Sequence, residues 1–283
     1  MMKKCEISVY IPTHRRVTLL RRAVESVLNQ KFSNFEVIVI NDGSDPDTIS
    51  YLKEISEKDN RVVYRSYSES KGACFARNLA LSLARGTYIT GLDDDDYFSE
   101  DRLEKLYEVR ALLDQYSFIS TATHFFDDDG RDGGLGFNSK TIITAKTLKK
   151  YNAVGNQVFS LTSRFRKLNG FDNGLSAWQD YDMWLRLVNK FGDGINTKDI
   201  TYHMDISDRS DRISLSRRKV DGIAKFIEKH NSGLGVLFKA RYNAMISHIG
   251  FEAKIEPDFL NKVFYYIFKI YYMIKSSKGL YEK

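Results

Sequence analysis

Short apolar runs alternate with segments of helical period through the first hundred residues of this chain. The runs at residues 7–11, 36–40, 61–67 and 87–91 have the length and composition of buried strands. Between the first two runs, Leu20, Val24 and Val27 recur at helical spacing. Strands that alternate with helices form a mostly parallel sheet through right-handed crossovers. The sequence therefore predicts an α/β fold in which helices flank a mostly parallel sheet.

Polar residues follow three of these strands directly. Thr13 follows the first strand, Asp42 ends the second, and residues 93–96 follow the fourth. In open α/β sheets, ligands bind in the crevice outside the carboxyl ends of the strands. We therefore expect these three loops to converge on one ligand site.

The loop after the fourth strand consists of four consecutive aspartates, Asp93, Asp94, Asp95 and Asp96. Carboxylates this close repel one another unless they are solvated, protonated or neutralised by a cation. All-oxygen ligation suits Mg²⁺ or Mn²⁺, which commonly take one or two protein carboxylates together with water and phosphate oxygens. The run taken alone leaves two interpretations open, a metal site or a solvated acidic turn.

Composition narrows the class of protein. The chain has 283 residues, 42% of them hydrophobic, which is enough for one large domain or a domain with a tail. Its two cysteines, Cys5 and Cys74, have no metal-ligand spacing, which indicates free thiols and a cytoplasmic location. The first apolar run is short and ends at Pro12, so it predicts a strand and not a signal peptide.

The charge balance indicates the chemistry of a partner. The formal net charge is +6, with the excess late in the chain. Such a balance suits phosphate-bearing substrates or anionic lipid. Zinc-finger, helix-turn-helix and RNA-binding aromatic patterns are absent from the sequence, so we expect no nucleic-acid partner.

The second half of the chain holds two further acidic segments. Residues 127–134 are rich in turn residues and lack the spacing of an EF-hand, so they predict a β-turn between two short strands. Asp180 and Asp182 fall in the first turn of an amphipathic helix that continues past Trp184. They either cap that helix or include a catalytic base.

Five motifs, taken in order, resemble the inverting family 2 glycosyltransferases with a GT-A fold. The resemblance covers residues 5–215 and rests on residues 11–13, 39–44, 72–78, 93–96 and 179–186. It implies a Rossmann-like, mostly parallel sheet that consists of a nucleotide-binding half, residues 1–97, and an acceptor-binding half, residues 98–215. Gln179 stands where the family usually has Glu, and this removes one charge beside the family's catalytic base.

The resemblance also assigns roles to residues. Pro12 and Thr13 would line the nucleotide pocket, Asp42 would bond the uracil, and Arg77 would lie near the base and phosphates. Asp93 and Asp95 look like the acids of the D-x-D motif. By the same resemblance, Asp93 would approach the ribose, Asp95 would ligate Mn²⁺ or Mg²⁺, Asp94 is the intervening position, and Asp180 matches the catalytic base.

A late histidine is a further candidate for the metal site. His203 falls where relatives often carry a loop that closes over the diphosphate, and it would be a metal ligand or a phosphate contact there. The alternative is a structural hydrogen-bonding role, which is common for a histidine at the end of a strand.

The implied activity is transfer of a hexose, glucose or galactose in β linkage, from a UDP-sugar to a saccharide acceptor. The acceptor would be undecaprenyl-diphosphate-linked GlcNAc or a growing unit of O-antigen, capsule or lipooligosaccharide. Two other classes stay open at this point, a metal-dependent nucleotidyltransferase and a non-catalytic basic protein of the membrane surface. A glycosidase is disfavoured, because it would need no metal that binds diphosphate.

The last part of the chain, residues 216–283, is expected to be a helical extension. Apolar residues from Phe259 to Ile274 follow helical spacing and are interleaved with lysines. This amphipathic helix either lies on an anionic membrane surface, at the cytoplasmic face of the inner membrane, or packs on the body or a partner chain. Four arginines lie around residue 216, where this extension begins, and they either clamp phosphate or form a solvated basic face: Arg209, Arg212, Arg217 and Arg218.

Overall fold

The computed structural model describes residues 5–43, 45–127, 129, 131–207, 217–230, 234–235, 238–240 and 242–244. The predicted helix from Phe259 to Ile274 lies outside these ranges, as do Arg209 and Arg212. Helix α8 (Arg217–His230) is described, but the side chains of its first three residues are not.

The chain divides into two compact units. The first comprises Met1–Ala145, Ala153–Asn173 and Gln179–Ser207, and the second comprises Lys146–Asn152, Gly174–Trp178 and Asp208–Lys283. The division of the chain at residues 215 and 216, and that of the first domain at residues 97 and 98, stay predictions.

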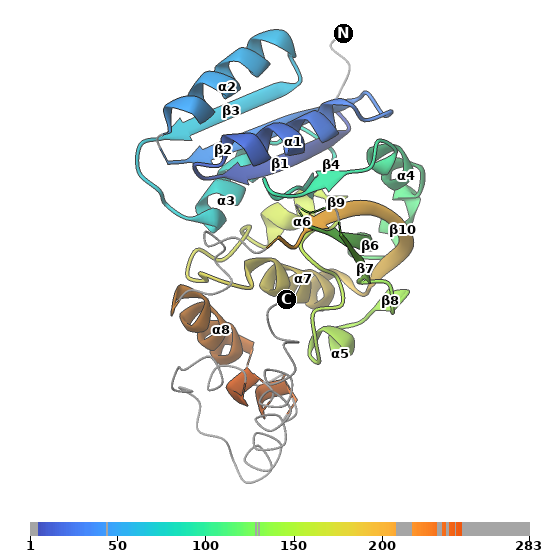
Figure 1. Cartoon of the computed structure of the whole chain (residues 1–283). Coiled ribbons are helices and arrows are strands. Elements are labelled where there is room, and N and C mark those ends of the chain that lie inside the picture. Colours follow the sequence, from blue (N-terminus) through green and yellow to red (C-terminus); the bar gives the residue numbers. More distant parts are fainter. Residues whose placement is uncertain are drawn as a thin grey trace. The chain divides into compact units, whose positions relative to one another are not determined.

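Four parallel strands and one short antiparallel strand form the main sheet of the first unit (Figure 1). In order across the sheet, they are β3 (Val62–Tyr67), β2 (Phe35–Asp42), β1 (Ile7–Thr13), β4 (Tyr88–Gly91) and β9 (Ser160–Leu161). Strand β1 is parallel to both of its neighbours, with Ile7 opposite Phe35 on one side and Tyr88 on the other. The predicted mostly parallel sheet is therefore confirmed.

Strand sequence and burial agree at the centre of this sheet. All eight residues of β2 are buried, and they read as a nearly continuous apolar run because helices cover both faces of a parallel sheet.

The helices that connect the four parallel strands are α1 (Val17–Leu28), α2 (Pro46–Lys58) and α3 (Ala73–Leu83). Helix α1 buries Leu20, Ala23, Val24 and Val27, the stripe expected from their spacing. Helix α2 begins at Pro46, and Asp45 caps it by accepting a bond from the Thr48 amide.

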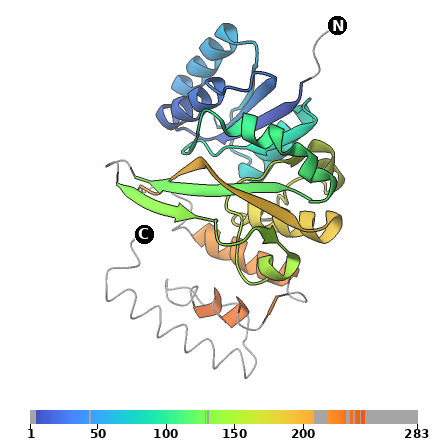
Figure 2. The ribbon, with the colours of Figure 1, turned by 90° about the vertical axis from the view of Figure 1, so that its right-hand side faces the viewer.

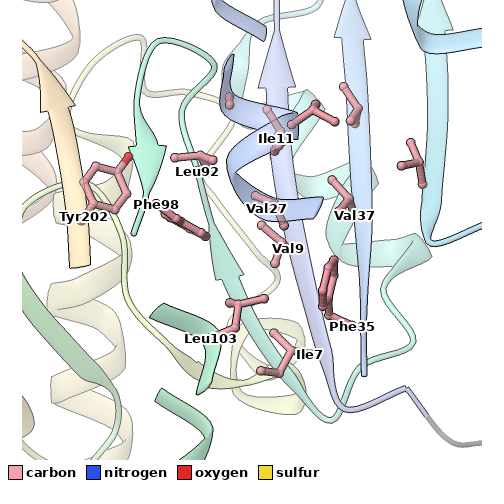
Figure 3. Packing of buried hydrophobic residues seen from close by; sticks show 14 of the residues in the cluster. Ile7, Val9, Ile11, Val27, Phe35, Val37, Leu92, Phe98, Leu103 and Tyr202 are labelled. Carbon is pink, nitrogen blue, oxygen red and sulfur yellow. The ribbon is translucent and has the colours of Figure 1, made fainter. Parts of the chain in front are cut away.

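The core of the first unit lies between α1 and the sheet. Figure 3 shows Val27 of α1 beside Val9 of β1, with Val37 of β2 next to them. The same cluster continues through Phe98 to Tyr202, which belongs to a second sheet. Each fully buried aliphatic side chain of this kind contributes about 1.5–3 kcal/mol. The cluster thus joins the two sheets into one body.

The second sheet is mixed (Figure 2), and like the main sheet it has five strands. Its strands are, in order, β5 (Tyr97–Phe98), β10 (Gly194–Asp205), β6 (Ile119–Phe126) and β7 (Asp132–Gly136), and β8 (Ile142–Ile143) pairs with β10. Strands β6 and β7 are antiparallel, with Phe126 opposite Asp132. Two strands thus flank the predicted turn at residues 127–134, but residues 132–134 belong to β7 and β6 is eight residues long, so the predicted turn was too long. Asp128 and Gly130 lie outside the described residues.

The remaining helices of the first unit are short, apart from one. They are α4 (Arg102–Glu108), the 3₁₀ helix η1 (Arg110–Asp114), α6 (Thr162–Lys167) and α7 (Gln179–Phe191), while α5 (Ala145–Leu148) lies at the junction of the two units. Helix α7 begins three residues before the position at which its periodicity becomes clear in the sequence, and it buries Trp184, whose Nε1 donates to the Gly155 carbonyl. Within the described residues, none of the helices has the length and apolar character needed to cross a bilayer.

Candidate active site

The four aspartates after β4 alternate between the protein interior and the surface. Asp94 and Asp96 are each 1% exposed. The side chains of Asp93 and Asp95 are 22% and 18% exposed. Residues two apart in this turn therefore share an environment, and the pair left accessible is the pair expected from the D-x-D pattern.

The two interior aspartates hold the turn in place. Asp94 accepts a hydrogen bond from the Thr13 hydroxyl at 2.7 Å and pairs with Arg16 at 2.7 Å. Burial raises the pKa of Asp94 to about 6, against the opposing charge of Arg16. Asp96 accepts from the Tyr202 hydroxyl at 2.6 Å and from the Asp205 amide at 2.9 Å. Its pKa is raised well above the usual range by burial and by the charge of Asp95.

Asp93 is surrounded by nitrogen donors. Its carboxylate accepts bonds from Arg77 at 3.0 Å, from Asn156 at 3.0 Å and from Gln157 at 3.2 Å. Gln157 is in turn held by the Tyr10 hydroxyl at 2.8 Å. The orientation of Asp93 is therefore fixed by side chains from α3, from β1 and from the segment that precedes β9.

Arg77 has donor capacity that the protein leaves unused. One of its terminal nitrogens binds Asp93, while Nε and Nη1 are buried and find no acceptor among the described residues. Its guanidinium also lies over the Phe171 ring, 5.5 Å from the centroid. Buried N–H groups without a partner are costly, so these two donors suit oxygen atoms of a ligand.

Asp180 reaches the same place from a distant part of the chain. It lies in the first turn of α7, and burial raises its pKa to about 6, with Arg77 opposing and Asp93 adding to the rise. The structure thus pairs Arg77 with Asp93 and places Asp180 near enough for both charges to act on it. The neighbouring Asp182 is buried and pairs with Arg186 at 2.8 Å, which gives it a structural role.

Asp42 lies at the carboxyl edge of β2, as expected, but its carboxylate is already engaged. It accepts from the Ser70 hydroxyl at 2.9 Å, from the Lys71 amide at 2.7 Å and from the Gly72 amide at 2.6 Å. These bonds tie β2 to the loop that opens α3. Pro12 lies in β1 opposite Ile40 of β2. The contacts of Asp42 with uracil and of Pro12 with the nucleotide stay predictions.

His203 makes the contacts of a structural residue. Its Nε2 lies 2.8 Å from the Ser99 hydroxyl and its Nδ1 lies 3.2 Å from Nδ1 of His124. The ring stacks on Tyr97 with centroids 4.4 Å apart, and burial lowers the pKa of His203 to about 4. Both ring nitrogens therefore face protein partners, and the metal-ligand role stays a prediction.

The donor chemistry fits a divalent ion that is completed by its substrate. Within the described ranges, His, Cys, Asp and Glu side chains do not gather in threes as a metal cage. Mg²⁺ and Mn²⁺ need only one or two carboxylates when phosphate and water supply the other oxygens. The accessible pair Asp93 and Asp95 meets that need, and Arg16 already supplies a positive charge beside Asp95.

Several residues of this site were not singled out from the sequence. Asn156 and Gln157 lie in a segment without apolar period, so nothing in the pattern distinguished their amides from those of an ordinary loop. Tyr202 reads as one more apolar residue of a strand. Arg16 follows the first strand by three residues, and that position was the one available signal for it.

Comparison with known proteins agrees with this geometry. Residues 8–171, more than half of the chain, match the family described as "Glycosyl transferase family 2". "Putative colanic acid biosynthesis glycosyl transferase WcaA" of Escherichia coli K12 is 33% identical over 226 residues, which cover 79% of this chain and 81% of that protein. Chondroitin synthase of Escherichia coli is 32% identical over 187 residues, which cover 64% of this chain and 26% of that protein.

Solved structures share the fold at low sequence identity. TarS 1–349 of S. aureus in complex with UDP-GlcNAc has a TM-score of 0.59 at 18% identity, covering 86% of this chain and 72% of that one. Mannosyltransferase PcManGT from Pyrobaculum calidifontis, in complex with GDP-Man and Mn²⁺, has a TM-score of 0.54 at 15% identity, covering 99% and 73%. The matched family excludes the non-catalytic alternative. The chain therefore belongs to glycosyl transferase family 2 and is a transferase enzyme with the predicted GT-A fold.

Proposed function

We propose that this enzyme transfers a hexose, glucose or galactose, from a UDP-sugar to a saccharide acceptor with inversion at the anomeric carbon. The observation that carries the proposal is the ion pair of Asp93 with Arg77, with Asp180 near enough for both charges to act on its carboxylate. It supplies groups for a departing diphosphate and a base for an attacking hydroxyl in one place. An α-linked donor would accordingly give a β-linked product.

The donor side of the reaction needs positive charge. As the bond between the anomeric carbon and the diphosphate oxygen breaks, negative charge develops on the diphosphate. Nε and Nη1 of Arg77, which find no acceptor among the described residues, suit these oxygens, since charge-assisted hydrogen bonds to phosphate are strong. A divalent ion held by Asp95 and Asp93 would stabilise the same charge when bound.

The acceptor side needs a base. The acceptor hydroxyl attacks the anomeric carbon and loses its proton, which Asp180 would accept. A carboxylate with a pKa near 6 is a better base than one in water, and it is still ionised at neutral pH. One base and one departing diphosphate complete a single in-line displacement.

Names of the relatives support a role in polysaccharide biosynthesis. WcaA carries colanic acid biosynthesis in its name, and two of the similar structures are complexes with UDP or UDP-GlcNAc. We extend this to an acceptor that is undecaprenyl-diphosphate-linked GlcNAc or a growing unit of O-antigen, capsule or lipooligosaccharide. Such an acceptor would place the enzyme in the cytoplasm, at the cytoplasmic face of the inner membrane.

The test is release of UDP from a panel of UDP-glucose, UDP-galactose and UDP-GlcNAc, with and without Mn²⁺ and with a synthetic lipid-diphosphate GlcNAc acceptor. We expect UDP release from one hexose donor. The acceptor should stimulate this release, and Asp95→Asn should abolish it while the protein stays folded. Release from no donor, together with no UDP binding that depends on Mn²⁺, would contradict the proposal.

A further inference from the structure

We infer that Arg16 is a counter-cation that competes with the divalent ion for Asp95 and thereby makes metal binding depend on the nucleotide. This inference rests on the proposed function, because it assigns metal binding to Asp95. It adds a thermodynamic linkage between the divalent ion and the nucleotide. Arg16, which carries this linkage, is neither one of the D-x-D acids nor the proposed base.

The two arms of the Arg16 guanidinium hold different carboxylates. Nη2 lies 2.7 Å from Oδ1 of Asp94, whose side chain is buried. Nη1 lies 3.3 Å from Oδ2 of Asp95, whose side chain is 18% exposed. Arg16 therefore has a shorter arm, which anchors it to the buried Asp94, and a longer arm, which bridges to the accessible Asp95, the expected metal ligand.

The backbone around Arg16 favours this anchoring. Arg16 precedes the first turn of α1 and follows β1 by three residues. Thr13, the last residue of β1, binds the second oxygen of Asp94 at 2.7 Å. Because Asp94 is held from both sides, loss of the longer arm would leave the anchor in place.

The two other arginines near this turn bind other groups. Arg22 pairs with Asp205 at 2.9 Å and donates to the main-chain oxygen of Asp95. Arg77 is engaged with Asp93. Arg16 therefore differs from both in placing its charge against the Asp95 carboxylate.

A divalent ion at Asp95 would meet two obstacles from this arrangement. It would displace the longer arm from the carboxylate, and it would lie close to a guanidinium of like charge. A nucleoside diphosphate relieves both, because its oxygens accept the freed N–H groups and neutralise the two cations. Binding of metal would therefore be weak alone and tighter with nucleotide, and by linkage metal would tighten nucleotide binding equally.

The test is a titration of the full-length protein with Mn²⁺ alone, in which free Mn²⁺ is followed by electron paramagnetic resonance, and a second titration with saturating UDP. Without UDP, we expect Arg16→Met to bind Mn²⁺ roughly three- to tenfold more tightly than wild type, the range of a partly exposed charge pair. With UDP, we expect the difference to vanish or reverse. The ratio of the Mn²⁺ affinity with UDP to that without UDP measures the coupling, and in Arg16→Met this ratio should be lower than in wild type by at least the same factor.

The matched control is Arg21→Met, which also removes one positive charge near the start of α1. The Arg21 guanidinium lies over the ring of Tyr51 in α2, 4.2 Å from its centroid. Its Mn²⁺ affinity should equal that of wild type. If Arg16→Met fails to fold, Arg16→Lys keeps the charge and shortens the reach, and it should give an intermediate affinity without UDP.

Three results would overturn the inference. They are equal or weaker Mn²⁺ binding by Arg16→Met without UDP, the same gain in Arg21→Met, and the absence of saturable Mn²⁺ binding in both proteins. The titration without UDP involves no sugar donor and no turnover. If the wild-type protein is inactive with every donor but Arg16→Met binds Mn²⁺ more tightly than wild type, the proposed function is rejected and the linkage is retained.

Discussion

At the scale of single residues, the aspartate run divides into two pairs with different tasks. Asp94 and Asp96 are buried and hold the turn through Thr13 and Tyr202. Asp93 and Asp95 remain accessible. The sequence predicted the pair for ligand binding through its resemblance to a family. It predicted that Thr13 and the aspartate run lie at one site, but not the hydrogen bonds of Thr13 and Tyr202 to the buried pair, because these partners lie more than seventy residues away along the chain.

The pH dependence of turnover should report the environment of Asp180. A base accepts a proton only in its ionised form, and the pKa of Asp180 is raised to about 6. We therefore expect kcat/KM to be constant above about pH 7 and to fall about tenfold per pH unit below pH 6. A profile of initial rates from pH 4.5 to 8.5 checks this. Rates that stay constant down to pH 4.5 would contradict the assignment.

The same pKa shift predicts that Asp180 weakens the fold at neutral pH. The folded-state pKa of about 6 exceeds the value of about 3.9 in an unfolded chain. The folded state thus holds the proton more tightly, and stability is lost as pH rises from about 4 through 6. Asp180→Asn should raise the free energy of unfolding by about 1–3 kcal/mol at pH 7.5.

Urea unfolding of both proteins at pH 7.5 and pH 4.5 measures this effect. The advantage of the variant should shrink by at least half at the lower pH, since wild-type Asp180 is largely protonated when folded there. A variant that is less stable than wild type at both values would contradict the account.

At the scale of elements, β10 connects the second sheet to the acidic turn. Tyr202 of this strand donates to Asp96 at 2.6 Å and accepts from the Asp93 amide at 3.4 Å, while the Asp205 amide donates to Asp96. A strand that is distant in sequence therefore fixes the loop after β4. Periodicity predicted the parallel strands well, but register and cross-sheet bonds depend on tertiary contacts that period alone does not contain.

Tyr202→Phe should loosen this connection. The change removes one donor from a buried carboxylate, and the expected loss is about 1–3 kcal/mol of unfolding free energy. Chemical denaturation at pH 7.5 measures it. The control is Tyr51→Phe, because the buried Tyr51 hydroxyl has no partner among the described residues and its removal should be neutral or stabilising. Equal effects of the two changes would show that Tyr202 contributes packing alone.

For helix α7, sequence patterns predicted the helix but not the roles of its two acidic residues. The sequence predicted an amphipathic helix with Asp180 and Asp182 in its first turn, and the structure confirms it, with a start at Gln179. Propensity does not decide this first turn, which carries Asp180 and Asp182 and is fixed by the pairing of Asp182 with Arg186. The helix and its first turn were therefore predictable, while the different roles of its two acids were not.

At the scale of the whole molecule, the fold was predictable because local and global signals agree. Three kinds of signal indicate one architecture: strands alternate with helices, polar residues stand at strand ends, and a glycine, Gly72, stands where the backbone has a positive φ of 93°. Membership of glycosyl transferase family 2 follows from a match over residues 8–171. The choice of donor sugar depends on a few hydrogen bonds in the pocket, and sequence patterns do not encode their geometry.

The measurement that tests the central claim most directly is the kinetics of Asp180→Asn beside its affinity for UDP. If Asp180 is the base of an inverting transfer, kcat should fall about 10²–10⁴-fold while the affinity for UDP with Mn²⁺ stays within about twofold, because the carboxylate acts on the acceptor. Retention of more than about a tenth of wild-type turnover, with UDP binding intact, would contradict the claim and require another base.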